Sequence, residues 1–117
     1  MSNFAGIFSI VYVTIKTGEY ASTLSRGLIE HKLAACINII KNVKSIYKWD
    51  NSIVEDDEHL LMIKTRTDTV PALTQYVKEH HPYKVCEVIS VPIRKYHRSI
   101  KEKQINLKLK IFFFFTK

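Results

Sequence analysis

The chain has 117 residues, of which 46% are hydrophobic and 25% are charged, a composition that suits one globular domain and excludes wholesale disorder. Its formal net charge of +7 would suit a nucleic-acid-binding protein, but the distribution of charge argues against that class. Residues 1–90 carry ten Lys or Arg and ten Asp or Glu, so the whole positive excess lies in residues 91–117. The neutral body and the basic C-terminal segment are therefore interpreted separately.

The apolar stretches are too short to cross a bilayer. The longest, residues 4–15, is interrupted by small and polar residues, whereas a membrane-spanning helix needs about 20 apolar residues. It also lacks the basic start and the small-residue cleavage site of a secretion signal. Cys36 and Cys86 are too few for a disulfide scaffold. These features predict a cytoplasmic protein with reduced thiols and no transmembrane segment.

The first 32 residues predict a strand followed by a helix. Residues 7–15 are rich in Ile, Val, Phe and Tyr, which is typical of a buried strand. In residues 18–32 the apolar positions change to helical spacing. Gly27 lies inside this helix at a cost of up to about 1 kcal/mol relative to alanine, which predicts close packing against a neighbouring element.

Residues 34–49 and 52–66 predict a β-hairpin of unusual length with a tight turn at residues 49–52. Fifteen strand residues extend about 50 Å, whereas strands usually have about five or six residues. A domain of this size cannot cover such arms, so we expect them to bend, to twist, or to project and pair with another chain. The hairpin therefore predicts an oligomer.

The rest of the body predicts a second helix and a fourth strand. Residues 69–80 have helical spacing, with Asp68 as N-cap and Pro71 in the first turn. Residues 85–91 are apolar and predict a buried strand. The order β-α-β-β-α-β predicts an α+β ferredoxin-like sandwich: an antiparallel sheet with both helices on one face and the first strand beside the fourth.

The strongest candidate for ligand chemistry in the body is the tetrad at residues 80–83, with the adjacent imidazoles of His80 and His81. Imidazole is a ligand for copper, zinc and nickel, and two histidines at a helix end have the freedom to converge on one ion. The alternative is that His81 satisfies carbonyl groups of the helix end while Tyr83 packs. Residue types alone favour this structural interpretation.

Other chemical candidates are weaker. The acidic run at residues 55–58 suits either a hard cation or charge pairing with Lys44 and Lys48 across the hairpin, and we favour a solvated strand. Tyr47 and Trp49, near the hairpin tip, suit either an exposed contact patch or a subunit seam, and we favour the seam. No phosphate-binding glycine loop, nucleophile elbow or HExxH motif is present, which argues against an enzyme. The third strand has no aromatic residue of the kind that RNA-binding sheets use, which argues against nucleic acid.

Several stretches of the body carry a family resemblance. They are LAACINII (33–40), SIYKW (45–49), LLMIKTR (60–66), VPAL (70–73) and HPYKVCEVI (81–89). In this order, without gaps and within residues 7–92, they resemble the CutA family of divalent-cation tolerance proteins. The resemblance implies a ferredoxin-like subunit in a tightly packed homotrimer whose hairpins contribute to the seams. It also implies a non-enzymatic role in tolerance to copper and other divalent metal ions.

The resemblance leaves a second function open. Animal relatives are credited with an anchoring or interaction role, which implies a protein partner. The trimer is also similar to PII signalling proteins, which implies a small-ligand or protein-interaction module in which the histidines are structural.

The resemblance also implies a metal site. In some members copper is assigned to two adjacent histidines and a cysteine late in the first strand. The histidines correspond to His80 and His81, but Val13 and Thr14 occupy the place of the cysteine. Cys86, on the strand expected beside the first, is the candidate substitute.

The resemblance ends near residue 92, so we divide the chain into a CutA-like domain (1–92) and an atypical segment (93–117). The family continues with a Gly-Asn segment, Tyr-Leu and a Trp on a short helix, whereas this segment is rich in Lys, Ile and Phe. Our first hypothesis is a retained intron, a frameshift or a gene-model error in an AT-rich genome. The second is a strand at residues 105–111 that replaces the missing seam. The third is contact of basic residues and Phe112–Phe115 with an anionic membrane.

Overall fold

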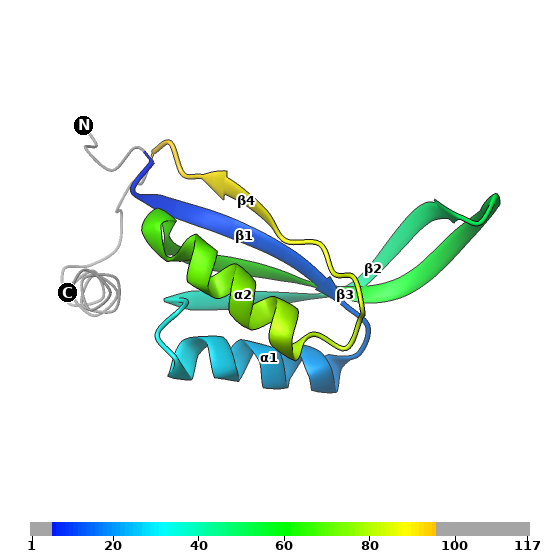
Figure 1. Ribbon diagram of the computed structural model, residues 1–117, viewed down its shortest axis with the longest axis horizontal. Helices are drawn as coiled ribbons and strands as arrows, with labels where there is room; N and C mark the ends of the chain where they lie inside the picture. Colours follow the sequence, from blue (N-terminus) through cyan, green and yellow to red (C-terminus); the bar gives the residue numbers. More distant parts are fainter. Residues whose placement is uncertain (1–5, 96–117) are drawn as a thin grey trace.

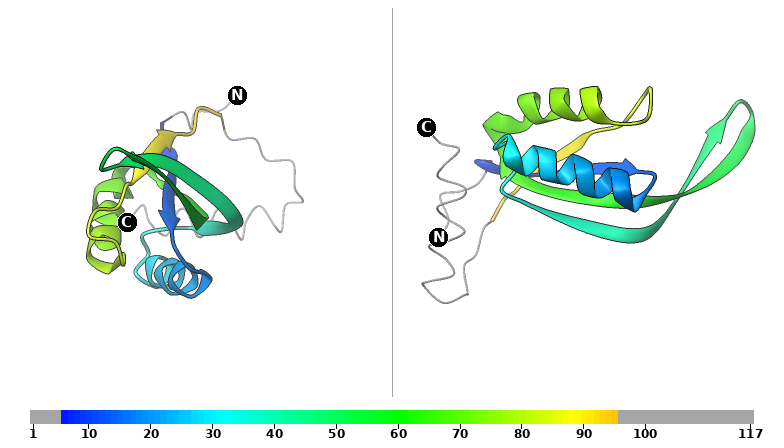
Figure 2. Two further views of the ribbon diagram at one scale, coloured as in Figure 1. Left: turned by 90° about the vertical axis from the view of Figure 1, so that its right-hand side faces the viewer. Right: turned by 90° about the horizontal axis from the view of Figure 1, so that it is seen from below.

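The computed structural model describes residues 6–95, so the three hypotheses for the C-terminal segment concern residues that lie almost wholly outside the described part. The elements are β1 (Phe8–Ile15), α1 (Gly18–Glu30), β2 (Cys36–Trp49), β3 (Ser52–Arg66), a 3₁₀ turn (Thr67–Thr69), α2 (Val70–His80) and β4 (Ile89–Pro92). The strand order is β2-β3-β1-β4 with every pair antiparallel, and the two helices lie on one face (Figures 1 and 2). The predicted ferredoxin-like α+β fold, with β1 beside β4, is confirmed.

The core lies between the helices and the sheet because alternate strand residues point toward the helices. The side chains with at most 3% exposure include Val11, Val13 and Ile15 of β1, Leu61 and Ile63 of β3, Leu24 and Leu28 of α1, and Leu73 and Val77 of α2. A Cβ at Gly27 would overlap the Tyr76 hydroxyl of α2, which confirms the predicted close packing there. Among the described residues, no helix is long and apolar enough to cross a membrane.

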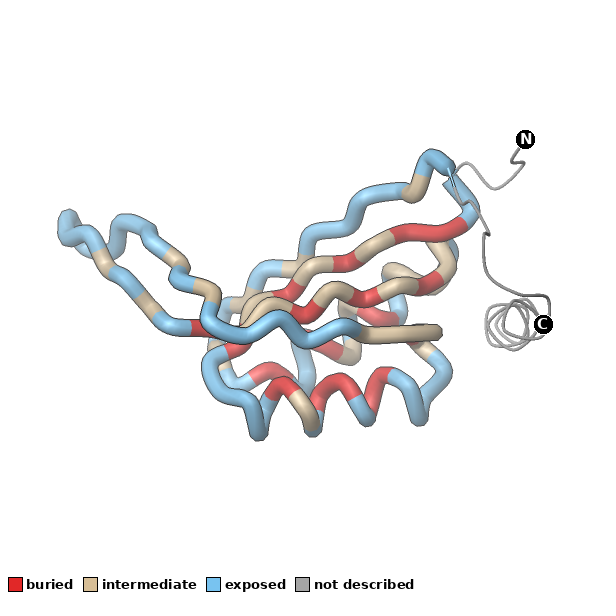
Figure 3. Tube along the Cα trace, turned by 180° about the vertical axis from the view of Figure 1, so that it is seen from behind, coloured by how far each residue is buried: buried red, intermediate tan, exposed pale blue. Residues whose placement is uncertain are grey.

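The long hairpin bends where the domain ends. Its turn residues Asp50 and Asn51 both have positive φ (49° and 65°), as a type I′ hairpin turn requires. The β2–β3 register shifts between Ile40 and Val43, where Asn42 has φ 62°. Such a bulge bends and twists the strand. Beyond it, residues 43–58 form an arm that leaves the domain and is mostly exposed (Figures 1 and 3), so the predicted bending and projection are confirmed.

The fourth strand is shorter and more exposed than predicted. Residues 85–88 are not in the sheet, and all four residues of β4 are exposed, so the prediction of a buried strand over 85–91 is wrong. The reason is that β4 is an edge strand that pairs with only four residues of β1. Cys86 and Val88 still pack against the core from the irregular segment before it.

The sheet face opposite the helices is apolar and uncovered in the single chain. It carries Tyr12 opposite Met62 of β3, with Ile89 on the other side of Tyr12. Tyr12 and Met62 are half-buried, and Ile89 is 48% exposed. An apolar sheet face that no helix covers is removed from water only when another protein surface packs against it.

Candidate functional site

The two predicted histidines end α2 but lie in different environments. His80 is exposed, and its ring stacks on Tyr76 with a centroid separation of 3.9 Å. His81 is only 8% exposed. The helix ends at His81, because the following Pro82 favours extended backbone there, and the observed ψ of 140° takes the chain after His81 out of the helical path.

Hydrogen bonds engage both ring nitrogens of His81. His81 Nε2 lies 2.8 Å from the carbonyl oxygen of Thr14 in β1, and His81 Nδ1 lies 3.1 Å from the backbone nitrogen of Tyr83. A carbonyl only accepts and an amide N–H only donates, so His81 is neutral with its proton on Nε2. Both ring nitrogens of His81 are therefore engaged, as the structural interpretation expects.

His80 keeps a nitrogen for a ligand. Its Nδ1 donates to the carbonyl oxygen of Tyr76 at 2.8 Å, so in the neutral imidazole the lone pair is on Nε2. His31 at the end of α1 has the same arrangement, with Nδ1 2.9 Å from the carbonyl oxygen of Gly27. Its ring lies 5.0 Å from that of Tyr76. The sequence analysis did not single out His31, because only the fold brings it beside Tyr76.

A buried carboxylate completes the surroundings of His81. Glu58 of β3 is 6% exposed and accepts a hydrogen bond of 2.6 Å from the Tyr83 hydroxyl. The rings of Tyr83 and His81 lie 4.6 Å apart. These bonds join β1, β3 and the segment after α2 at the point where the arm leaves the domain. We call this cluster the hinge network; it consists of Thr14, Glu58, His81 and Tyr83.

Sequence analysis placed Glu58 in the acidic run at residues 55–58 but predicted neither its burial nor its bond to Tyr83; the other members of the run are exposed or half-buried. Lys44 Nζ lies 3.1 Å from Asp57 and 3.9 Å from Glu55, so charge pairing, the alternative to the favoured solvated strand, is present at Lys44, on side chains that are themselves largely exposed. Such exposed pairs contribute little to stability. In the sequence, Glu58 differs from the other three acidic residues only in being the last of the run, which places it nearest the domain.

Burial, and then the hydrogen bond to Glu58, raise the pKa of Tyr83 above its ordinary value of 10.0. Tyr83→Phe is expected to lower the free energy of unfolding by about 1–2 kcal/mol at pH 7, because Glu58 loses a donor. The raised pKa stabilises the folded chain by an amount that is fully present below pH 10. Above pH 10 the unfolded chain loses the Tyr83 proton while the folded chain still retains it. This stabilisation is therefore lost as the pH rises toward the folded pKa. Urea unfolding between pH 8 and 11 should show the gap between wild type and Tyr83→Phe narrowing above pH 10. A constant gap would contradict the raised pKa.

The predicted thiol ligand is separate from the imidazoles. Cys36 and Cys86 are free and half-buried, and Cys86 packs against the core. Within residues 6–95 no three His, Cys, Asp or Glu side chains are grouped as a metal site requires. In this conformation His80, His81 and Cys86 are not brought together.

The strand order, the one-sided helices and the projecting β2–β3 hairpin define an α+β protein of the ferredoxin-like class. The model of the CutA1 divalent ion tolerance protein family matches residues 9–102, and the chain belongs to this family.

Curated relatives and solved structures agree with this membership. A Xenopus laevis protein CutA homolog is 52% identical over 94 residues, which are 80% of this chain and 62% of that protein. The chain spans about half of mouse protein CutA (51%), with 44% identity. The divalent-cation tolerance protein CutA of Thermus thermophilus is 43% identical over 76% of this chain and 86% of its own length. The crystal structure of CutA1 from Oryza sativa superposes with a TM-score of 0.78 at 35% identity, over 94% of this chain and 97% of that one.

Proposed function

We propose that this chain assembles as a cytoplasmic homotrimer that binds copper in divalent-cation tolerance, without catalysing a reaction. The observation that carries the metal-binding part is the free Nε2 of His80. Its Nδ1 is anchored on a backbone carbonyl, which is the arrangement that orients imidazoles toward metals. The C-terminal end of α2 adds a negative dipole that favours a cation.

The proposed binding mode is weak and exchangeable. A single anchored imidazole per chain holds a metal ion weakly. Such a site is better suited to an ion that is taken up and released than to a permanently bound cofactor. His81 and Cys86 remain predicted ligands, but His81 would first have to give up its bonds to Thr14 and Tyr83. Cys86 would have to leave its packing against the core.

The proposed trimer is supported by three surfaces that a single chain leaves uncovered. The first is the helix-free sheet face around Tyr12 and Met62, and the second is the unpaired outer edge of β2. The third is the arm, where Trp49 and Ile53 are 65% and 71% exposed. Large exposed apolar surfaces of this kind mark protein–protein contacts.

His80→Ala is expected to weaken Cu²⁺ binding at least fivefold, because it removes the free Nε2. Titration of the full chain with Cu²⁺, followed by electron paramagnetic resonance, measures both affinity and nitrogen ligation. His31→Ala is the matched control: its imidazole is anchored in the same way, but the cationic Lys32 follows it where a second histidine follows His80, so the variant should change the affinity less than twofold. Equal losses in the two variants would contradict a specific site at His80. No wild-type binding below millimolar Cu²⁺ would favour the small-ligand or protein-interaction module instead.

A further inference from the structure

Tyr76 of α2 makes two contacts with the His80 side chain. Its backbone carbonyl oxygen accepts the hydrogen bond from His80 Nδ1 at 2.8 Å. Its ring stacks on the imidazole with a centroid separation of 3.9 Å and an interplanar angle of 14°. The two residues are four positions apart on one helix, where side chains of neighbouring turns meet. One hydrogen bond and one stacked face together leave the imidazole little freedom to rotate.

Tyr76 is itself held in place by its surroundings. It is half-buried and packs against the hydrophobic core. Its hydroxyl lies over Gly27 of α1, at the position that a Cβ would occupy. A glycine inside a helix costs stability, and here the missing side chain makes room for the tyrosine ring. Tyr76 is therefore a rigid support for the His80 imidazole.

His31 contacts the same ring in a different geometry. Its ring centroid lies 5.0 Å from that of Tyr76, and the two planes are tilted by 46°. Its Nδ1 lies 2.9 Å from the carbonyl oxygen of Gly27, so the two imidazoles are anchored alike. The imidazole of His80 is stacked on the tyrosine face, whereas that of His31 is not. A tilted ring at the longer separation shares less surface with Tyr76 than a parallel ring does.

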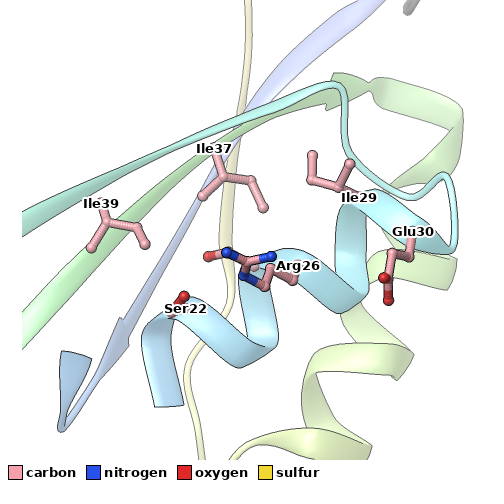
Figure 4. A pocket seen from close by; sticks show the side chains of 7 residues that line it. Ser22, Arg26, Ile29, Glu30, Ile37 and Ile39 are labelled. Carbon is pink, nitrogen blue, oxygen red and sulfur yellow. The ribbon is translucent and has the colours of Figure 1, made fainter. Parts of the chain in front are cut away.

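This cluster lies away from the surfaces that other copies are expected to cover. On one side, α1 faces the edge strand β2 across a groove lined by Ile29 of α1 and Ile37 of β2 (Figure 4). Gly27 and His31 are each two positions from Ile29, so they lie on the opposite side of α1, toward Tyr76 of α2. We therefore expect the histidines around Tyr76 to stay open to solvent in the proposed trimer.

A parallel tyrosine ring favours a metal-bound imidazole in two ways. The negative face of an aromatic ring attracts a cation, and an imidazole that donates its lone pair to a divalent ion becomes electron-poor. A ligand whose orientation is fixed beforehand also loses less conformational freedom when the ion binds. At exposed sites the attraction between a cation and an aromatic face corresponds to a gain in affinity of about two- to fivefold.

We infer that Tyr76 is a positioning residue for the proposed metal site: its stacked ring fixes the His80 imidazole and thereby strengthens the binding of the ion. The inference rests on the proposed function, because it concerns the affinity of that same site. Tyr76 does not touch the ion and acts only through the orientation of His80.

Tyr76→Leu tests the ring alone, because the carbonyl that anchors His80 belongs to the backbone and remains. NMR of the metal-free full chain measures the shifts of the histidine ring protons. In wild type the His80 protons should lie upfield, since they are above the face of Tyr76, and in Tyr76→Leu they should move downfield. Titration with Cu²⁺, followed by electron paramagnetic resonance, should show that Tyr76→Leu binds about two- to fivefold more weakly than wild type.

Tyr76→Phe is the matched control. It keeps the aromatic face, so it should retain the upfield His80 protons and bind Cu²⁺ within about twofold of wild type. Tyr76→Met also removes the ring while keeping an apolar side chain, and it replaces Tyr76→Leu if that variant does not fold.

The inference is overturned if the His80 protons of wild type and Tyr76→Leu coincide, or if the two proteins bind Cu²⁺ equally well. An equal loss of affinity in Tyr76→Phe and Tyr76→Leu would also overturn it, because the ring would then not be responsible. If wild type has upfield His80 protons but binds no Cu²⁺ below millimolar concentration, the proposed function fails. The effect of Tyr76 on affinity fails with it, whereas the positioning of His80 by Tyr76 stands.

Discussion

Replacing His81 with alanine is expected to lower the free energy of unfolding by about 2–4 kcal/mol, whereas His80→Ala should change it by less than about 0.5 kcal/mol. The two residues are neighbours in sequence and chemically identical, so the difference depends on burial and bonding alone. His81 is 8% exposed and bonded through both ring nitrogens, whereas His80 is exposed.

The large effect at His81 has three sources. Alanine removes the donor to the Thr14 carbonyl and the acceptor for the Tyr83 amide, and unsatisfied buried groups of this kind cost about 1–3 kcal/mol each. It also leaves a cavity beside Tyr83, whose ring contacts the imidazole. Displacement of Tyr83 would in turn weaken its bond to the buried Glu58.

Urea unfolding followed by circular dichroism measures this difference, at one chain concentration because assembly shifts the transition. His80→Ala is the matched control, and His81→Gln is the conservative variant, since a side-chain amide still donates to Thr14 and should recover part of the loss. If His81→Ala unfolds like wild type, the hinge network does not support the domain, and a ligand role becomes the better account of His81.

Met62→Glu is expected to dissociate the proposed trimer completely. Met62 lies on the helix-free sheet face, opposite Tyr12 of β1 and Asn38 of β2. If this face is covered by other copies, the substitution places one carboxylate per chain in a dry interface without a partner. The cost of burying an unpaired charge exceeds what such a contact surface contributes.

Light scattering behind a sizing column measures the outcome. Wild type should have three times the chain mass of 13.6 kDa, and Met62→Glu the mass of one chain. Gln75→Glu introduces the same charge on an exposed position of α2 and should stay trimeric. A wild-type mass of one chain would contradict the trimer, and a trimeric Met62→Glu would show that the helix-free face is not the contact surface.

Most of the fold was predictable because its signals are local. The alternation of strand residues, the helical spacing after Gly18 and the turn residues Asp50 and Asn51 act over a few positions. They predicted the elements, the sheet order and the projecting hairpin. The start of β4 was not predictable, because Val85 and Cys86 are residue types that are common in buried strands, whereas β4 begins only at Ile89.

The candidate site was predictable only in its residue types. The sequence by itself determined that two adjacent imidazoles lie at the end of the second helix, that an acidic run lies on the third strand, and that the domain has the family's fold. Only the tertiary structure decided that His81 bonds Thr14, 67 positions away, and that Tyr83 bonds Glu58, 25 positions away. The physical reason is that a polar group binds a ligand or supports the fold according to which distant groups surround it, and those neighbours are set by packing rather than by sequence spacing.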